Sequence, residues 1–335
     1  KRLFPLCSSL ATTYLSLTSA AIKDMNNNAV VAIGSSAAQQ AASYVGDATP
    51  PNLVSFDLDL TAEMMSLTFD ETIRASSLNL AVCKVQSLSS GDGAAAYVLT
   101  GIVSRTADST VVNVTLNIAD LNELKRLTGV ATSVANTFLS FTNQFATDMY
   151  GNAIVAIANN AGHQVNVFTA DSTQPRLVSF DLDMDAALLT MTFDETVKAS
   201  SLLVTSFTLQ SSAVRSANAE LYETLTTSSS CSSADGVVLV VDIGLDDMNE
   251  LKRQLQLTVS RATSYLAIMA TGLTDMNNNP IVSVSSTNAK QVNVFVADAT
   301  APSLDAFDFN KSLGTVTMYF SETILSGSIS PIEMT

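Results

Sequence analysis

The chain has 335 residues, of which 47% are hydrophobic and 14% charged, so it contains enough apolar material for packed cores and is not a disordered tail. Its 16 basic and 31 acidic residues give a formal charge of −15, which opposes phosphate backbones and excludes nucleic acid as an expected partner. Apolar runs stay shorter than the ~20 residues of a membrane span, and the opening "KRLFPLCSSL" lacks the apolar core of a signal peptide. We therefore expect a mature, soluble segment.

An acidic strand pattern recurs along the chain. Phe56, Phe180 and Phe307 head three copies at spacings of 124 and 127 residues, and the segments "TFDET", "TFDET" and "YFSET" keep the same spacings. Self-similarity at a fixed period predicts a tandem array, and a unit of ~125 residues is large enough to be a domain by itself. The first residues, "KRLFPLCSSLATTYLS", align without gaps on "KRLTGVATSVANTFLS" from Lys125. We expect a window on a longer array, with the C-terminal part of a repeat at 1–46, complete repeats at 47–170 and 171–297, and the N-terminal part of a further repeat at 298–335.

Strands are predicted in each repeat from the alternation of apolar and polar residues. Residues 53–59 alternate with the period of two that is expected of a half-buried strand, and Met65, Leu67 and Phe69 do the same. Further strands are predicted at 78–85 and 97–103, and in the segments that start at residues 111, 137 and 165. Seven short strands, mostly antiparallel, are typical of an immunoglobulin-like sandwich.

One helix interrupts the strands of each repeat. In "ADLNELKRL" three leucines recur at helical spacing, Asp120 can cap the first turn, and a basic pair lies at the C-terminal end, where the helix dipole favours it. The second copy is "DDMNELKRQL" from Asp246. The predicted fold class is therefore all-β, with tandem immunoglobulin-like sandwiches of about seven strands and one short helix per unit.

The order of the motifs in each repeat resembles that of a known family. "DATPPNLVSF", then "LTFDET", then a strand bearing Tyr or Phe, then "TDMYGNAI" or "TDMNNNPI" is similar to the Ig-like domains of bacterial S-layer and adhesin proteins. The resemblance implies an extracellular spacer, scaffold or adhesive module without catalysis. The "LNELKR" helix and the length of the repeat depart from the family pattern.

Acidic residues are predicted to gather at one end of each repeat, and the helix at the other. If consecutive strands run up and down, the linker, the "FDET" segment and the "TDMYGN" turn all reach the same end. In the first complete repeat this places together Asp47, Asp70, Glu71, Asp148 and Asn152. In the second it places together Asp171, Asp194, Glu195, Asp275 and Asn279. In a head-to-tail array, this acidic base would meet the helical cap of the preceding repeat.

Three interpretations of the acidic base stay open at this point. The Asp and Asn residues of the turns close Asx-type turns with their own backbone. Alternatively, the oxygen-rich cluster binds Ca²⁺, although no segment has the spacing of an EF-hand loop and no cofactor is otherwise required. The third interpretation is salt bridges, with Lys125 and Arg126 of one cap facing Asp194 and Glu195 of the next base, each worth ~0–1 kcal/mol. The cap residues assigned to these contacts are Lys125, Arg126, Lys252 and Arg253.

The chain lacks the residue patterns of an active site. Its single histidine, His163, is expected in a solvated loop without a nucleophile, and alternation turns the carboxylates of Asp57 and Asp59 outward. No glycine-rich phosphate-binding motif is present, so we expect no enzyme activity.

Two modification signals and three cysteines remain. "NVT" at Asn113 and "NKS" at Asn310 are candidate glycosylation sites. The cysteines Cys7, Cys83 and Cys231 occupy positions that do not correspond between repeats, so we expect buried free thiols rather than a disulfide framework or a metal cluster.

These observations favour a non-catalytic structural repeat protein of an extracellular filament, hair, sheath or surface layer. Its partners would be copies of itself or other subunits of the filament. The alternatives are the stalk of a cell-surface adhesin and accessory modules of a secreted polysaccharide-active enzyme.

Overall fold

The computed structural model of the chain describes residues 6–91, 93–215 and 221–330. The chain divides into two compact units, of which the first ends at Ala170 and the second begins at Asp171. Residues 1–5 and 331–335, at the outer ends of the two predicted partial repeats, lie outside the described residues. Neither of the two described α-helices is long and apolar enough to span a membrane.

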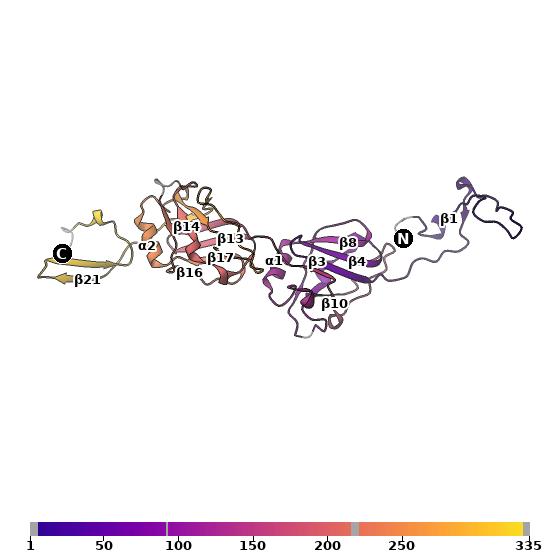
Figure 1. The fold of residues 1–335 in the computed structure, drawn as a ribbon, viewed down its shortest axis with the longest axis horizontal. Helices are drawn as coiled ribbons and strands as arrows, with labels where there is room; N and C mark the ends of the chain where they lie inside the picture. Colours follow the sequence, from indigo (N-terminus) through magenta and orange to yellow (C-terminus); the bar gives the residue numbers. More distant parts are fainter. Residues whose placement is uncertain (1–5, 92, 216–220, 331–335) are drawn as a thin grey trace. The chain divides into compact units, whose positions relative to one another are not determined.

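The regular structure of the first complete repeat (residues 47–170) consists mostly of strands (Figure 1). The strands described in it are β3 (Leu53–Asp59), β4 (Met64–Ile73), β5 (Cys83–Gln86), β6 (Ala96–Val98), β7 (Ile102–Arg105), β8 (Ser109–Leu116), β9 (Phe138–Phe141), β10 (His163–Gln164) and β11 (Val167–Thr169). They form a five-stranded sheet in the order β11-β3-β4-β8-β7 and a four-stranded sheet in the order β10-β9-β5-β6. Neighbouring strands are antiparallel, except that β11 runs parallel to β3.

The second complete repeat (residues 171–297) has the same architecture. Its described strands are β12 (Leu177–Asp183), β13 (Leu188–Val197), β14 (Phe207–Gln210), β15 (Tyr222–Thr224), β16 (Ser230–Cys231), β17 (Gly236–Asp242), β18 (Tyr265–Ile268), β19 (Lys290–Gln291) and β20 (Phe295–Val296). The sheet orders, β16-β17-β13-β12-β20 and β15-β14-β18-β19, match those of the first repeat strand for strand. The prediction of a mostly β chain is confirmed.

The two sheets of each repeat contribute to one hydrophobic core. In the first repeat Phe56 and Leu67 from the five-stranded sheet cluster with Val85 and Leu139 from the four-stranded sheet, and all four side chains are fully buried. The alternation in β3 and β4 therefore directs one face of the hairpin inward, as the period of two predicts.

The predicted strand count of about seven is wrong, because the structure has more and shorter strands. The expected strand at 97–103 is two strands, β6 and β7, which belong to different sheets and are separated at Thr100 and Gly101. The expected strand at 78–85 begins as a 3-10 turn, η4 (Leu80–Val82), which follows η3 (Ala75–Ser77), before β5 starts. Oδ1 of Asn79 accepts a hydrogen bond from the N–H of Ala81 at 3.1 Å, a local hydrogen bond that competes with strand pairing.

One short helix lies at an end of each complete repeat, α1 (Ile118–Arg126) and α2 (Leu245–Arg253) (Figure 1). The N-cap of α1 is Asn117, whose side chain accepts a hydrogen bond from the N–H of Asp120 at 2.8 Å. The prediction that Asp120 is the cap is therefore wrong: the cap lies three residues earlier, and Asp120 is the third residue of the helix and is buried.

The two partial repeats keep the local structure of the complete ones. The N-terminal segment (residues 6–46) contains the strands β1 (Tyr14–Leu15) and β2 (Gln39–Gln40), which pair antiparallel. The C-terminal segment (residues 298–330) contains the hairpin of β21 (Leu304–Asn310) and β22 (Thr315–Phe320). The loops of β3–β4, β12–β13 and β21–β22 have a positive φ at the same position, namely at Glu63, Ala187 and Gly314.

Candidate functional site

An Asp–Asn turn closes one end of each complete repeat. Oδ1 of Asp275 accepts hydrogen bonds from the backbone N–H groups of Asn277 and Asn279, at 2.9 and 2.7 Å, and Oδ2 accepts one from Nδ2 of Asn279 at 2.8 Å. Asp148 makes the same set of contacts in the first repeat. Turn closure therefore accounts for the hydrogen bonds of both aspartates.

The same turn holds the linker that leads into the repeat. Nδ2 of Asn279 also donates to the backbone O of Asp171 at 3.1 Å, and Nδ2 of Asn152 donates to the backbone O of Asp47 at 3.1 Å. These contacts bring the linker aspartate beside the turn aspartate.

Three carboxylates meet where the linker and the turn come together. In the second repeat these base acids are Asp171, Glu195 and Asp275, which have 4%, 4% and 1% of their surface exposed. One oxygen from each lies within 4.8 Å of the others. The corresponding base acids of the first repeat, which meet the same distance limit, are Asp47, Glu71 and Asp148.

Burial and charge both act on Asp275. Burial raises the pKa of Asp275 above its ordinary value, the hydrogen bonds from Asn279 oppose this rise, and the negative charge of Asp171 adds to it. A proton or a cation at the base acids would relieve this repulsion.

Calcium is one cation that the base acids could hold, because it takes 6–8 oxygen ligands. However, both oxygens of Asp275 already accept hydrogen bonds from the turn, which uses part of their lone-pair capacity. Calcium binding stays a prediction, and calorimetric titration of the chain with Ca²⁺ would test it.

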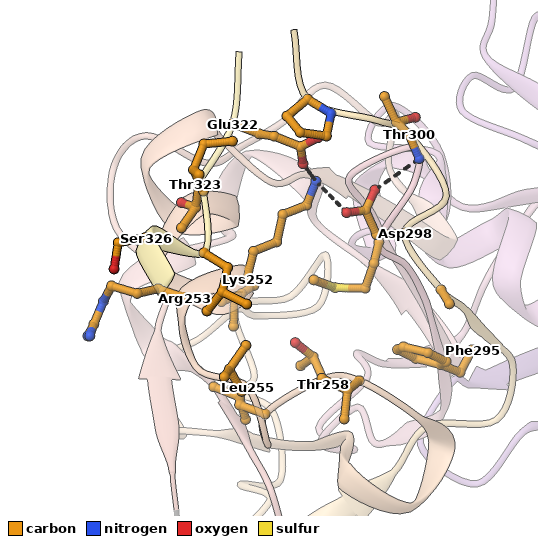
Figure 2. Close-up of a pocket in the computed structure, with 18 residues that line it drawn as sticks. Lys252, Arg253, Leu255, Thr258, Phe295, Asp298, Thr300, Glu322, Thr323 and Ser326 are labelled. Carbon is orange, nitrogen blue, oxygen red and sulfur yellow. Dashed lines mark hydrogen bonds and ion pairs between the residues drawn. The ribbon is translucent and has the colours of Figure 1, made fainter. Parts of the chain in front are cut away.

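A lysine from the helix binds the corresponding acids of the C-terminal segment. Nζ of Lys252 in α2 lies 3.0 Å from Oδ2 of Asp298 and 2.5 Å from Oε2 of Glu322 (Figure 2). Asp298 and Glu322 correspond in sequence to Asp171 and Glu195. Burial opposes the charge on Lys252, but its hydrogen bonds to Glu322 and Asp298 outweigh burial and raise the pKa of the ammonium group.

Further hydrogen bonds surround this ion pair. The backbone N–H of Thr323 donates to Oδ1 of Asn249 at 2.9 Å, and the Thr323 hydroxyl reaches the backbone O of Asn249 at 3.0 Å. Oδ1 of Asp185, in the β12–β13 loop, accepts from the N–H of Ala299 at 3.0 Å and from the hydroxyl of Thr300 at 2.8 Å. We call this set of contacts, together with the Lys252 ion pairs, the cap–base junction.

A cavity of about 560 Å³ lies beside the junction. Lys252 extends to one side of it, between Glu322 and Asp298, while Phe295 and Leu255 lie on the opposite side (Figure 2). The cavity is therefore amphipathic, but the charge of Lys252 is already matched by two carboxylates.

The arginine at the end of each helix pairs with a glutamate of the same helix. Arg253 pairs with Glu250, three residues earlier in its own helix, and its predicted contact with the next base stays a prediction. Arg126 forms the same kind of pair with Glu123, at 2.7 Å. The predicted contacts of Lys125 and Arg126 with the next base stay predictions.

Asp70 and Asp194 hold the start of the first strand of their repeats rather than joining the base acids. Oδ1 of Asp70 accepts from the N–H of Asn52 at 2.8 Å, and Oδ1 of Asp194 accepts from the N–H of Arg176 at 2.8 Å. Alternation explains the difference, because neighbouring residues of the "FDET" strand point to opposite sides.

Sequence reasoning missed the role of the buried aspartate in each helix. Asp120 is fully buried and accepts hydrogen bonds from the hydroxyl of Tyr97 at 2.9 Å, from the N–H of Thr100 at 2.9 Å and from Nδ2 of Asn117 at 3.0 Å. Burial, then the hydrogen bond to Asp120, raises the pKa of Tyr97 to about 12. Asp120 therefore fastens the β6–β7 connection to the helix.

Asp247 has the same role in the second repeat with different partners. It accepts from the N–H of Thr226 at 2.9 Å and from the hydroxyl of Ser229 at 2.5 Å. Gly244 replaces the asparagine cap, because a Cβ there would lie 2.1 Å from the backbone O of Ser228. The only sequence signal was the recurrence of an aspartate at the third position of both helices.

His163 and the cysteines show no arrangement for nucleophilic catalysis among the described residues. His163 lies in the short strand β10, half-buried with its ring 6.4 Å from that of Phe56, so the expectation of a solvated loop is wrong. The three cysteines are free: Cys83 is buried as expected, Cys231 is half-buried, and Cys7 is exposed, contrary to the expectation. Burial raises the pKa of the Cys83 thiol, which makes it unreactive.

Comparison with known proteins gives no relative that could assign a role to the junction. No protein-family model matches the chain, and no curated protein matches it significantly.

Proposed function

We propose that the chain is a non-catalytic structural repeat protein of an extracellular filament, hair, sheath or surface layer, built from Ig-like domains joined end to end. The observation that carries this proposal is Lys252, an ammonium group from the cap of one repeat held between Asp298 and Glu322 of the next segment. This contact joins two different surfaces, the cap of one unit and the base of the next. Contacts between unlike surfaces can repeat along an open chain without closing into a ring.

The Ig-like part of the proposal is supported by the two sheets of each complete repeat, which share one core. A five-stranded and a four-stranded sheet of mostly antiparallel strands are consistent with a sandwich. The resemblance of the motifs to S-layer and adhesin repeats favours the same interpretation, with an extracellular location and copies of the chain, or other subunits, as partners.

The sequence supports recurrence of the junction residues. Asn122 and Lys125 occupy the positions in α1 that Asn249 and Lys252 occupy in α2. A linker aspartate and a strand glutamate, like Asp298 and Glu322, likewise occur in each complete repeat. A structural array needs this periodicity, whereas a single binding site does not.

Electron microscopy of the native material tests the proposal. We expect ordered polymers whose axial spacing is a multiple of the length of one repeat. Isolated flexible rods would favour the stalk of an adhesin instead. Binding to insoluble polysaccharide without any polymer would favour accessory modules of a polysaccharide-active enzyme.

A further inference from the structure

The loop of the first hairpin differs in chemistry between the copies. The loops run from Asp59 to Met64, from Asp183 to Leu188, and from Asn310 to Thr315. An aspartate thus stands at the first position in two copies and an asparagine in the third. The first copy has Thr61 and the third copy has Ser312 two residues later, and only the third copy combines this hydroxyl with an asparagine in the sequon Asn310-Lys311-Ser312.

Asn310 keeps the structural role of the aspartates that it replaces. Oδ1 of Asp183 accepts hydrogen bonds from the N–H groups of Asp185 and Ala186, at 2.9 and 2.8 Å. Oδ1 of Asn310 accepts from the N–H groups of Ser312 and Leu313, at 3.1 and 3.0 Å. The carbonyl oxygen of the asparagine is therefore sufficient to close the loop.

The amide nitrogen of Asn310 is not used by the loop, because within the described part of the chain Nδ2 of Asn310 makes no hydrogen bond. Asn310 is exposed in the C-terminal segment, which holds only the first hairpin of its repeat, and the equivalent Asp59 and Asp183 are half-buried in the complete repeats. The loop thus presents a carboxamide nitrogen that the turn does not use, at a position that stays partly accessible beside the other strands.

The other sequon is held in a different way. Asn113 lies within β8, which is paired with β4 on one side and β7 on the other. Its Oδ1 accepts a hydrogen bond from the hydroxyl of Ser66 at 2.8 Å, and the hydroxyl of Thr115 is 2.9 Å from that of Ser104. Both polar side chains of this sequon therefore contribute cross-strand hydrogen bonds.

We infer that Asn310, and not Asn113, is an acceptor of an N-linked glycan. In this reaction Nδ2 of Asn310 forms a bond to the anomeric carbon of a sugar carried on a polyprenyl diphosphate. The bond between that carbon and the diphosphate oxygen breaks, the diphosphate leaves with the electron pair, and one amide proton passes to a base of the transferase. The inference rests on the proposed extracellular function, because the donor and the transferase belong to a secretory membrane.

Peptide mass spectrometry of the chain from its native source tests the inference. We expect the peptide that contains Asn310 to carry hexose and N-acetylhexosamine masses, and treatment with a peptide amidase to remove them and convert Asn310 to aspartate. The peptide that contains Asn113 should have its unmodified mass. An unmodified Asn310 peptide from extracellular material would overturn the inference while leaving the proposed function intact, whereas recovery of the chain from inside the cell only would overturn the proposed function.

A matched variant separates modification from folding. Asn310→Asp restores the residue of the other two copies, so the loop stays closed while the acceptor nitrogen is lost. We expect the variant, expressed in the native host, to lack the glycan and to keep the thermal unfolding profile of the deglycosylated chain. Ser312→Ala should likewise abolish the modification, and glycan retained in either variant would contradict the assignment.

Discussion

The two complete repeats have the same strands in the same order, yet they surround their buried helix aspartate with different groups. Asp120 is held by a tyrosine hydroxyl, that of Tyr97, whereas Glu223 occupies the corresponding position near Asp247. Burial, followed by the charges of Glu250 and Asp247, raises the pKa of Glu223. We therefore expect the fold to depend on the helix aspartate, and the residue beside it to set how each repeat responds to pH.

The largest expected effect comes from removing the aspartate itself. Asp120→Ala and Asp247→Ala each leave several buried donors without an acceptor, and we expect a loss of about 3 kcal/mol in the affected repeat. Hydrogen exchange resolved by peptide would measure it, with faster exchange in β6 and β7 for the first variant and in β15 and β16 for the second. Unchanged exchange in both repeats would show that the shared aspartate does not hold the fold.

A smaller loss is expected at the cap–base junction of α2, which depends on a lysine that both helices have in sequence. Lys252→Met keeps most of the apolar side chain but leaves Asp298 and Glu322 without their cation. Because the three groups are only partly buried, we expect a loss of about 1–2 kcal/mol in the protection of residues 298–303 and 321–325.

The matched control is Arg253→Met, one residue further along the helix. Arg253 pairs with Glu250 at the surface, so we expect a change below about 0.5 kcal/mol. Equal effects of the two variants would mean that the charge of the helix end, and not the geometry of Lys252, holds the C-terminal segment.

Replacing Glu223 by tyrosine, the residue that Tyr97 provides at this position in the first repeat, should remove the pH response that Glu223 gives to the second repeat. The pKa of Glu223 is raised in the folded state, so its contribution to stability is complete below the unfolded value, about 4.5, and is lost as pH rises through the folded value. Glu223→Tyr should therefore flatten the acid limb of the stability curve of the second repeat and raise its stability at neutral pH. Thermal unfolding between pH 3 and about 7 measures this, and a curve unchanged in shape would contradict it.

The hairpins show what the sequence could predict. Alternation located β3 and β4 and their inward faces, because both depend on residues close in sequence. The hairpin of β21 and β22 makes the same point, because it has the same register shift at the start of its first strand as β3–β4 and β12–β13. The register therefore follows residues that are close in sequence.

The features that sequence reasoning missed depend on distant residues. The split of the predicted strand at 97–103 follows from Thr100, whose N–H and hydroxyl turn to Asp120 of the helix, 20 residues later. At the junction the pairing of a cap lysine with a base glutamate was predicted, and the linker aspartate was predicted to lie in the base. The ion pair of Lys252 with the linker residue Asp298 was not predicted, because the expected partners of the cap were the two acids of "FDET".

The smallest expected effect concerns the base acids, where the two complete repeats are alike. The pKa of Asp275 is raised above its unfolded value of about 3.8, so its contribution to stability is present below that value and is lost as pH rises through the folded one. Asp275→Asn removes this dependence. The substitution also removes the hydrogen bond that Oδ2 of Asp275 accepts from Nδ2 of Asn279, which costs about 1 kcal/mol, and it stabilises the folded state by removing the repulsion from Asp171. The two changes oppose each other, so we expect a net change near zero at neutral pH together with a flatter profile below pH ~5. A large loss at neutral pH would mean instead that the ionised Asp275 is needed, as it would be if the base acids bound a cation.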